Sequence, residues 1–138
     1  MAINTSRGTG AIESMKPDFS GEYVLNRAAS TLSPLGAANV ETASLRIKLD
    51  EPTFGCEGKF FFANGGTGQW NFELATDQGP QDGSSARWDG DALAVTIQTP
   101  GPIITFHYAF DGENRLRLAE QLRGTGHDQD NIWVFDRC

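Results

Sequence analysis

The feature that most restricts the fold is a series of short segments, from Phe19 onward, in which apolar and polar residues alternate. Alternation with a period of two places successive side chains on opposite faces of an extended strand. Clusters of Gly, Asp, Asn and Pro separate the segments and are typical of turns. The predicted strands span 20–27, 43–50, 54–63, 68–76, 84–89, 92–99, 102–110, 115–123 and 130–137. The sequence therefore predicts an antiparallel all-β domain.

Short strands joined by short connections are best accommodated when the sheet closes on itself. An open sheet would leave two exposed edges, whereas a single up-and-down antiparallel β-barrel of about 8–10 strands removes them. A barrel of this size has room for one small ligand. A two-sheet sandwich is the alternative. One short helix is expected after the first strand, at 33–42, where Ser33 can cap it and Pro34 suits its first turn.

Composition and charge narrow the class of protein. The 138 residues suffice for one β-barrel domain at 18–138, preceded by a flexible polar tail at 1–17. The formal net charge of −7 disfavours nucleic acid as a partner. The chain contains no apolar run of about 18 residues and no apolar secretion signal. We therefore expect a cytoplasmic protein without a membrane span, a monomer or weak homodimer, in which Cys56 and Cys138 are free thiols rather than a disulfide.

The segment "SSARWDGDALAVTI" predicts a β-hairpin, because Asp89-Gly90 is a preferred two-residue turn. In that register Trp88 lies opposite Asp91 and shares one face of the sheet with Leu93. This face is apolar and consistent with burial.

One carboxylate interrupts the apolar face of the segment 115–123. Leu116, Leu118 and Leu122 alternate and predict a buried face, and Glu120 falls in the same row. An unpaired charge is costly to bury, so this carboxylate must be paired, hydrogen-bonded or protonated. In one interpretation Glu120 lies in water at the barrel end or pairs with an arginine. In the other it is a cavity carboxylate that orients a ligand or moves a proton.

The length of the preceding loop decides which residues surround Glu120. A five-residue loop at 111–115 places Phe106 opposite Glu120 and Tyr108 diagonal to it, within reach of a polar pair. A three-residue loop places Ile104 opposite instead. We expect an odd loop length, because it buries the aromatic side chains together with the leucines.

The other face of this segment carries Arg115, Arg117 and Arg123, which we expect to be exposed. In the alternative orientation Arg123 and Gln121 would point inward and could bind a ligand carboxylate. His107 alternates out of phase with its aromatic neighbours and has no nucleophile as a partner. The cysteines and histidines are too scattered for a zinc site, and we expect neither a metal nor a cofactor.

Aromatic side chains dominate the predicted interior, which suits a planar or polyene ligand. Each of them alone is also typical of a packed core, and Tyr23 in particular is expected to close the barrel. The candidate ligand-binding residues are Tyr23, Phe60, Phe62, Trp70, Phe72, Phe106, Tyr108, Leu118, Glu120 and Trp133. If the protein is an enzyme, Glu120 and Tyr108 are the candidate catalytic residues.

The first strand, "PDFSGEYVLNRAAS", resembles the Gly-x-Trp region that opens lipocalins and their calycin relatives, with Tyr23 in place of the tryptophan. The segments "LRIKLDEPTF", "FELATD", "RWDGDAL" and "EQLRGTGHDQDNIWVFDR" are similar to small bacterial lipocalin-like proteins of unassigned function. The resemblance covers most of 18–137. It implies a calycin-type barrel whose mouth takes an apolar small molecule, and it carries no catalytic set.

Two functions from different classes remain open at this point. The first is binding of an apolar or aromatic small molecule inside the barrel. The alternative is a cofactor-independent enzyme of the cyclase or lyase type, since some bacterial calycin-like barrels catalyse cyclisation, including Diels–Alder reactions, in natural-product biosynthesis. Such an enzyme would hold a flexible substrate in a reactive shape. A third possibility is an interaction protein with a filled core, which the presence of a cavity would contradict.

Overall fold

The computed structural model of the protein describes residues 16–34, 37–124, 126 and 128–138. Most of the tail expected at 1–17 lies outside these residues. Within the described part of the chain, no helix is long and apolar enough to cross a membrane.

All nine predicted strands are present, close to their predicted bounds. They are β1 (Gly21–Leu25), β2 (Val40–Asp50), β3 (Thr53–Phe62), β4 (Thr67–Ala75), β5 (Ser85–Asp89), β6 (Ala92–Gln98), β7 (Ile103–Phe110), β8 (Arg115–Arg123) and β9 (Gln129–Arg137). The short helix expected at 33–42 is a single 3-10 turn, η2 (Ala37–Asn39), and another, η1 (Arg27–Ala29), follows β1. The strand β2 begins directly after η2 because the β-branched Val40 pairs with Phe62 of β3.

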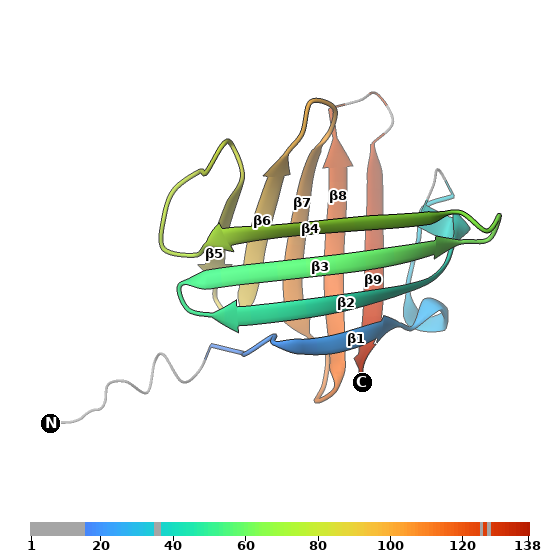
Figure 1. Ribbon diagram of the computed structural model, residues 1–138, viewed down its shortest axis with the longest axis horizontal. Coiled ribbons are helices and arrows are strands. Elements are labelled where there is room, and N and C mark those ends of the chain that lie inside the picture. The colour runs from blue at the N-terminus through green and yellow to red at the C-terminus, as the bar shows by residue number, and fades with distance from the viewer. Residues whose placement is uncertain (1–15, 35–36, 125, 127) are drawn as a thin grey trace, which may run out of the picture.

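The strands form one antiparallel sheet that almost closes on itself. Consecutive strands pair from β1 to β4 and from β5 to β9, and β1 also pairs with β9. In Figure 1, β2–β4 cross in front of β6–β9, and the interior lies between these layers. No described residue of β4 pairs with β5, so one seam of the barrel stays open. The predicted up-and-down barrel is confirmed.

The register of the β5–β6 hairpin differs from the prediction. Trp88 pairs with Leu93, not with Asp91, because the two turn residues are Gly90 and Asp91. Gly90 adopts a φ of +66°, which suits the first central position of a two-residue hairpin turn. The shift is an even number of residues, so Trp88 keeps its predicted face of the sheet.

The β7–β8 hairpin has the predicted odd loop. Phe110 pairs with Leu116 across the five residues 111–115, and Phe106 lies opposite Glu120. The row that contains Glu120 therefore faces the interior, where Leu116 is 0% exposed.

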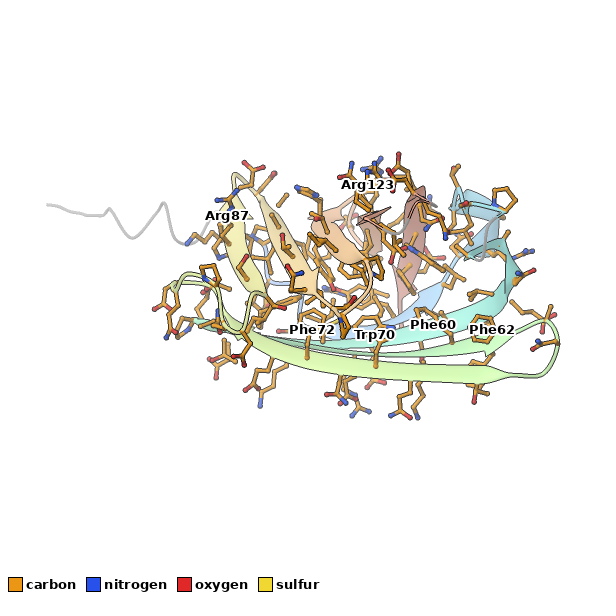
Figure 2. All side chains as sticks on the ribbon, turned by 90° about the horizontal axis from the view of Figure 1, so that it is seen from above. Phe60, Phe62, Trp70, Phe72, Arg87 and Arg123 are labelled. Atoms are coloured by element: carbon orange, nitrogen blue, oxygen red, sulfur yellow. The ribbon has the colours of Figure 1, made fainter. Side chains whose placement is uncertain are left out.

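The arginines of β8 lie on the outer face, as predicted. The Nη2 atom of Arg123 donates a hydrogen bond of 2.6 Å to Oδ1 of Asp130, and Arg117 is exposed. Figure 2 shows Arg123 on the side away from the interior. The alternative orientation, with Arg123 and Gln121 lining the cavity, is therefore wrong.

One end of the barrel, which we call the closed end, is sealed by Phe19, Tyr23, Trp88, Phe110 and Arg137. Phe19 is 0% exposed and stacks on Trp88 with 5.9 Å between ring centroids. The Tyr23 hydroxyl donates to the carbonyl oxygen of Phe19 at 2.7 Å and accepts from Nη2 of Arg137 at 2.8 Å. The Arg137 guanidinium lies over the rings of Tyr23 and Phe110, at 5.4 and 5.2 Å from their centroids.

Candidate functional site

A cavity of about 350 Å³ lies in the other half of the barrel, which we call the open end. The described residues that line it are Leu45, Phe60, Trp70, Asn71, Phe72, Ile97, Thr99, Ile104, Phe106, Leu118, Glu120, Trp133 and Phe135. Figure 2 shows Phe60, Trp70 and Phe72 projecting from β3 and β4 towards the opposite layer. The lining is almost entirely apolar, which is typical of sites for small molecules.

The cavity reaches the open seam of the barrel. Its wall continues from Trp70 and Phe72 on β4 to Ile97 on β6 and Ile104 on β7, although β4 is not paired with those strands. Asn71 also borders the cavity, and it is an exposed residue of β4 that points outward. On this side the cavity is therefore closed by side chains rather than by a strand pair.

A glycine opposite Trp70 makes room for its indole ring. Gly58 of β3 pairs with Trp70 across the sheet. A Cβ atom added to Gly58 would lie 2.6 Å from ring atoms of Trp70, so any other residue would displace the ring. Sequence reasoning missed this residue, and the available signal was a glycine inside a predicted strand, which indicates a close approach.

The aromatic side chains around the cavity form two groups of stacked rings. The ring of Trp70 stacks with Phe72 at 5.8 Å and 10°, and with Phe106 at 6.4 Å and 14°. Beside this group Phe60 stacks with Trp133 at 5.7 Å and 25°, and the ring of Phe60 is tilted by 46° to that of Trp70. These rings present flat faces and edges with which a planar ligand can stack.

Glu120 is held in the cavity wall by two hydrogen bonds to the same oxygen atom. Asn131, directly opposite on β9, donates from Nδ2 to Oε1 at 2.9 Å. The indole Nε1 of Trp133 donates to Oε1, also at 2.9 Å. The amide oxygen of Asn131 in turn accepts from the backbone N–H of Ser33 at 2.7 Å, which fixes the orientation of the amide.

The environment of Glu120 changes its acidity. Burial raises the pKa of this carboxyl above its usual range, and the hydrogen bonds from Trp133 and Asn131 oppose that rise only in part. The alternative in which Glu120 pairs with an arginine is not seen among the described residues, where no ion pair includes Glu120. The residue is therefore a cavity carboxylate with neutral hydrogen-bond donors.

A second, smaller cavity of about 280 Å³ adjoins the first one. The two cavities share Phe60, Glu120 and Trp133 in their walls. The remaining described residues of the smaller cavity are Ala37, Val40, Phe62, Leu122, Gln129 and Asn131. Glu120 thus borders both cavities, and Ala37 of the 3-10 turn η2 lines the smaller one with it.

The structure brings most of the predicted site residues together. Phe60, Trp70, Phe72, Phe106, Leu118, Glu120 and Trp133 line the main cavity, and Phe62 lines the smaller one. Tyr23 and Tyr108 border neither cavity among the described lining residues. Tyr23 belongs to the closed end, where burial raises the pKa of its hydroxyl despite the hydrogen bond from Arg137.

Tyr108 lies in the packed centre of the barrel, although it is close to Glu120 along the strands. Its hydroxyl donates to Sγ of Cys56 at 3.5 Å, and the side chain is 0% exposed. The expected polar pair of Tyr108 and Glu120 is not formed, because the Tyr108 hydroxyl bonds to Cys56 on β3 instead. Burial raises the pKa of the Cys56 thiol to about 12, and both cysteines are free.

Several lining residues were not predicted as site residues. Ile97 and Ile104 lie on the inward faces of their strands. The alternation of apolar and polar residues could have identified them as lining residues. Asn131 lies in the strand predicted at 130–137, β9, and it is 1% exposed, but it was not among the predicted site residues. Within the described chain, no cluster of three or more His, Cys, Asp or Glu residues is able to hold a metal ion.

No protein-family model and no curated protein sequence matches this chain. Solved structures do match it over most of its length. Zebrafish ileal bile acid-binding protein, complexed with cholic acid, has 9% identity, covers 87% of this chain and 98% of its own, and gives a TM-score of 0.56. Fatty-acid-binding protein 1 of Echinococcus granulosus has 10% identity, 86% and 96% coverage and a TM-score of 0.56.

The wild-type fluorescent protein UnaG is similar to the same extent, with 15% identity, 87% and 97% coverage and a TM-score of 0.54. These matches span nearly all of each chain, so the likeness concerns the whole barrel rather than one hairpin. At such low identities it establishes the fold alone, an up-and-down β-barrel of the type that these three proteins have.

Proposed function

We propose that the protein binds an apolar small molecule with a planar ring system in the cavity at the open end. The observation that carries this proposal is the cavity itself, an accessible space walled by aromatic plates and containing one carboxylate. Its volume of about 350 Å³ falls at the lower end of the range of ligand sites. An apolar ligand gains free energy by leaving water for such a site.

The fold neighbours support a binding role. The zebrafish protein was solved with cholic acid bound, and the Echinococcus protein is named for fatty acids. A cofactor-independent enzyme has less support, because the Tyr108 hydroxyl is directed to Cys56 and not to a ligand that would contact Glu120. Binding is therefore the function we put to the test.

The direct test is a substitution that fills the cavity with a larger side chain and a measurement of ligand affinity. Ile104→Trp adds an indole inside the cavity, whereas the neighbouring Ile103, which is 42% exposed, gives a matched control on the outer face as Ile103→Trp. We expect methylnaphthalene to bind the wild type and Ile103→Trp alike in isothermal titration calorimetry. We expect Ile104→Trp to bind at least about tenfold more weakly, because the added ring occupies the same volume. Equal binding by both variants would contradict the proposed site.

Native mass spectrometry of the protein purified from its own host complements this test. A co-purifying apolar compound whose mass signal disappears in Ile104→Trp would identify the natural ligand. Thermal unfolding of both variants shows that each is folded before its binding is compared.

A further inference from the structure

Among the residues that the structure describes, the walls of the two cavities contain an acidic side chain but no basic one, and this restricts which ligands can bind. Glu120 is the single titratable side chain among the described residues that line either cavity. No lysine, arginine or histidine is among these described residues, and the nearest arginine on β8, Arg123, is engaged on the outer face by Asp130. A bound anion would therefore find no cation to pair with.

The other polar groups in the described walls carry no charge. The indole N–H of Trp70 and the amide of Gln129 belong to them, and other members are already engaged or are exposed. The hydroxyl of Thr99 donates to the carbonyl oxygen of Pro102 and accepts from the N–H of Gly101, within its own loop. The amide of Asn131 is used by Ser33 and Glu120. Asn71 is exposed beside the seam.

Among the charged groups of the walls, hydrogen-bonding capacity remains on one atom of Glu120. Both donors of the wall, Asn131 and Trp133, bond to Oε1. Oε2 accepts no hydrogen bond from a described residue, and it is not one of the enclosed side-chain atoms that lack a partner. Because Glu120 borders both cavities, we take this oxygen as the atom that is available to a ligand.

The charge of the carboxylate determines what can approach this oxygen. A carboxylate accepts hydrogen bonds and donates none, so a ligand group with an O–H or N–H satisfies it. A ligand carboxylate would place a second negative charge beside the first in a poorly solvated site, which disfavours binding. The net charge of −7 adds to this repulsion over a longer range.

We infer that the cavity selects ring compounds that carry a hydrogen-bond donor, such as a hydroxyl or ammonium group, and rejects the corresponding carboxylates. The Oε2 atom of Glu120 is the acceptor that makes this choice. The inference rests on the proposed function, because it assigns the polar group of the ligand that the aromatic walls bind. Discrimination of this kind combines an attractive contact with a repulsive one.

A series of ligands with one ring system tests the inference on the full chain. Methylnaphthalene, naphthylmethanol, naphthylmethylamine and naphthoic acid differ almost only in the polar group. At neutral pH we expect the alcohol and the amine to bind about tenfold more tightly than methylnaphthalene, as one hydrogen bond to a charged acceptor allows. We expect naphthoate to bind at least about tenfold more weakly than methylnaphthalene. Isothermal titration calorimetry measures all four affinities.

Glu120→Gln should abolish this order rather than weaken the binding of all four compounds alike. The glutamine oxygen can keep the two hydrogen bonds from Asn131 and Trp133. The NH2 group of the glutamine then stands in the place of Oε2, and it donates a hydrogen bond where Oε2 accepted one. The amine should lose its advantage of about tenfold, and naphthoate should gain about as much. Glu73→Gln, on the exposed face of β4, removes the same charge from the protein and should leave the order unchanged.

The outcomes separate this inference from the proposed function. If none of the four compounds binds the wild type, the proposed function fails. If methylnaphthalene binds but naphthoate binds equally well or better, the cavity stands and the donor preference is wrong. The wild-type series decides this point even if Glu120→Gln does not fold. A Glu120→Gln variant that folds and keeps the wild-type order would also overturn the role of Oε2.

Discussion

The two ends of the barrel each place one charged side chain among aromatic rings, and they use it differently. At the closed end the guanidinium of Arg137 is covered by the rings of Tyr23 and Phe110 and bonds to the Tyr23 hydroxyl. At the open end Asn131 and Trp133 both donate to one oxygen of Glu120, and the other oxygen accepts no hydrogen bond from a described residue. The comparison indicates that the first charge serves packing and the second is left available for a ligand.

The largest difference between the two ends should appear in stability. Phe19→Ala removes a ring that is 0% exposed and stacked on Trp88, and should lower the free energy of unfolding by about 3–5 kcal/mol. Urea unfolding measures this loss. A cost below about 1 kcal/mol would show that the closed end is not the rigid part of the barrel.

A smaller loss is expected when one hydroxyl is removed from the closed end. Tyr23→Phe deletes the buried hydrogen bond to the carbonyl oxygen of Phe19 and the part-buried one that the Tyr23 hydroxyl accepts from Arg137. We expect a loss of about 1–3 kcal/mol in urea unfolding, because two polar groups lose their short hydrogen bond. Ligand affinity at the open end should stay the same, and a change there would show that the two ends are coupled.

The open end should respond in the opposite way, with a small loss of stability and a large loss of binding. Phe60→Ala removes a half-buried ring of the cavity wall, whereas Phe61→Ala removes a ring that is 43% exposed on the outer face. We expect Phe60→Ala to lose about 1 kcal/mol of stability and about tenfold in affinity for methylnaphthalene. Phe61→Ala is the control, and equal affinities of the two variants would remove Phe60 from the site.

The smallest effect concerns the pH dependence of stability at the open end. Because burial raises the pKa of Glu120, the folded protein binds its proton more tightly than the unfolded chain does. Stability should therefore fall as the pH rises from the unfolded value of 4.5 through the raised pKa of the folded state. Glu120→Gln cannot titrate, so its stability relative to the wild type should increase across this window.

Urea unfolding of the wild type and Glu120→Gln at several pH values between about 5 and 8 checks this sign. Glu73→Gln controls for the loss of one negative charge from the exposed surface. A difference between Glu120→Gln and the wild type that decreases with rising pH would contradict the assigned environment of the carboxyl.

The faces of the strands were predictable from the sequence because alternation is a local property. Leu116, Leu118 and Glu120 share the inner face as the pattern predicted, and the odd loop at 111–115 followed from burying the aromatic residues beside them. The β5–β6 register failed by two residues because two adjacent positions can host the same glycine turn. Because the error was an even number of residues, the face of the sheet predicted for Trp88 was still correct.

The partners of the polar side chains were harder to predict, because they come from strands distant in the sequence. Tyr108 donates to Cys56, which is 52 residues away, and no local pattern relates the two. Asn131 could have been found by extending the parity argument across the β8–β9 hairpin, where it lies directly opposite Glu120. That Oε2 of Glu120 lacks a hydrogen bond from a described residue could not be predicted from the sequence, because it depends on both donors bonding to Oε1.

The distribution of the tryptophans gives the protein an optical readout of its own cavity. Of the 3 tryptophans, Trp70 and Trp133 line the cavity, whereas Trp88 belongs to the closed end. A ligand that enters the cavity changes the polarity and the stacking around the first two indoles and leaves the third as an internal reference. Emission quenching and energy transfer to an aromatic ligand can therefore follow occupancy without any attached label.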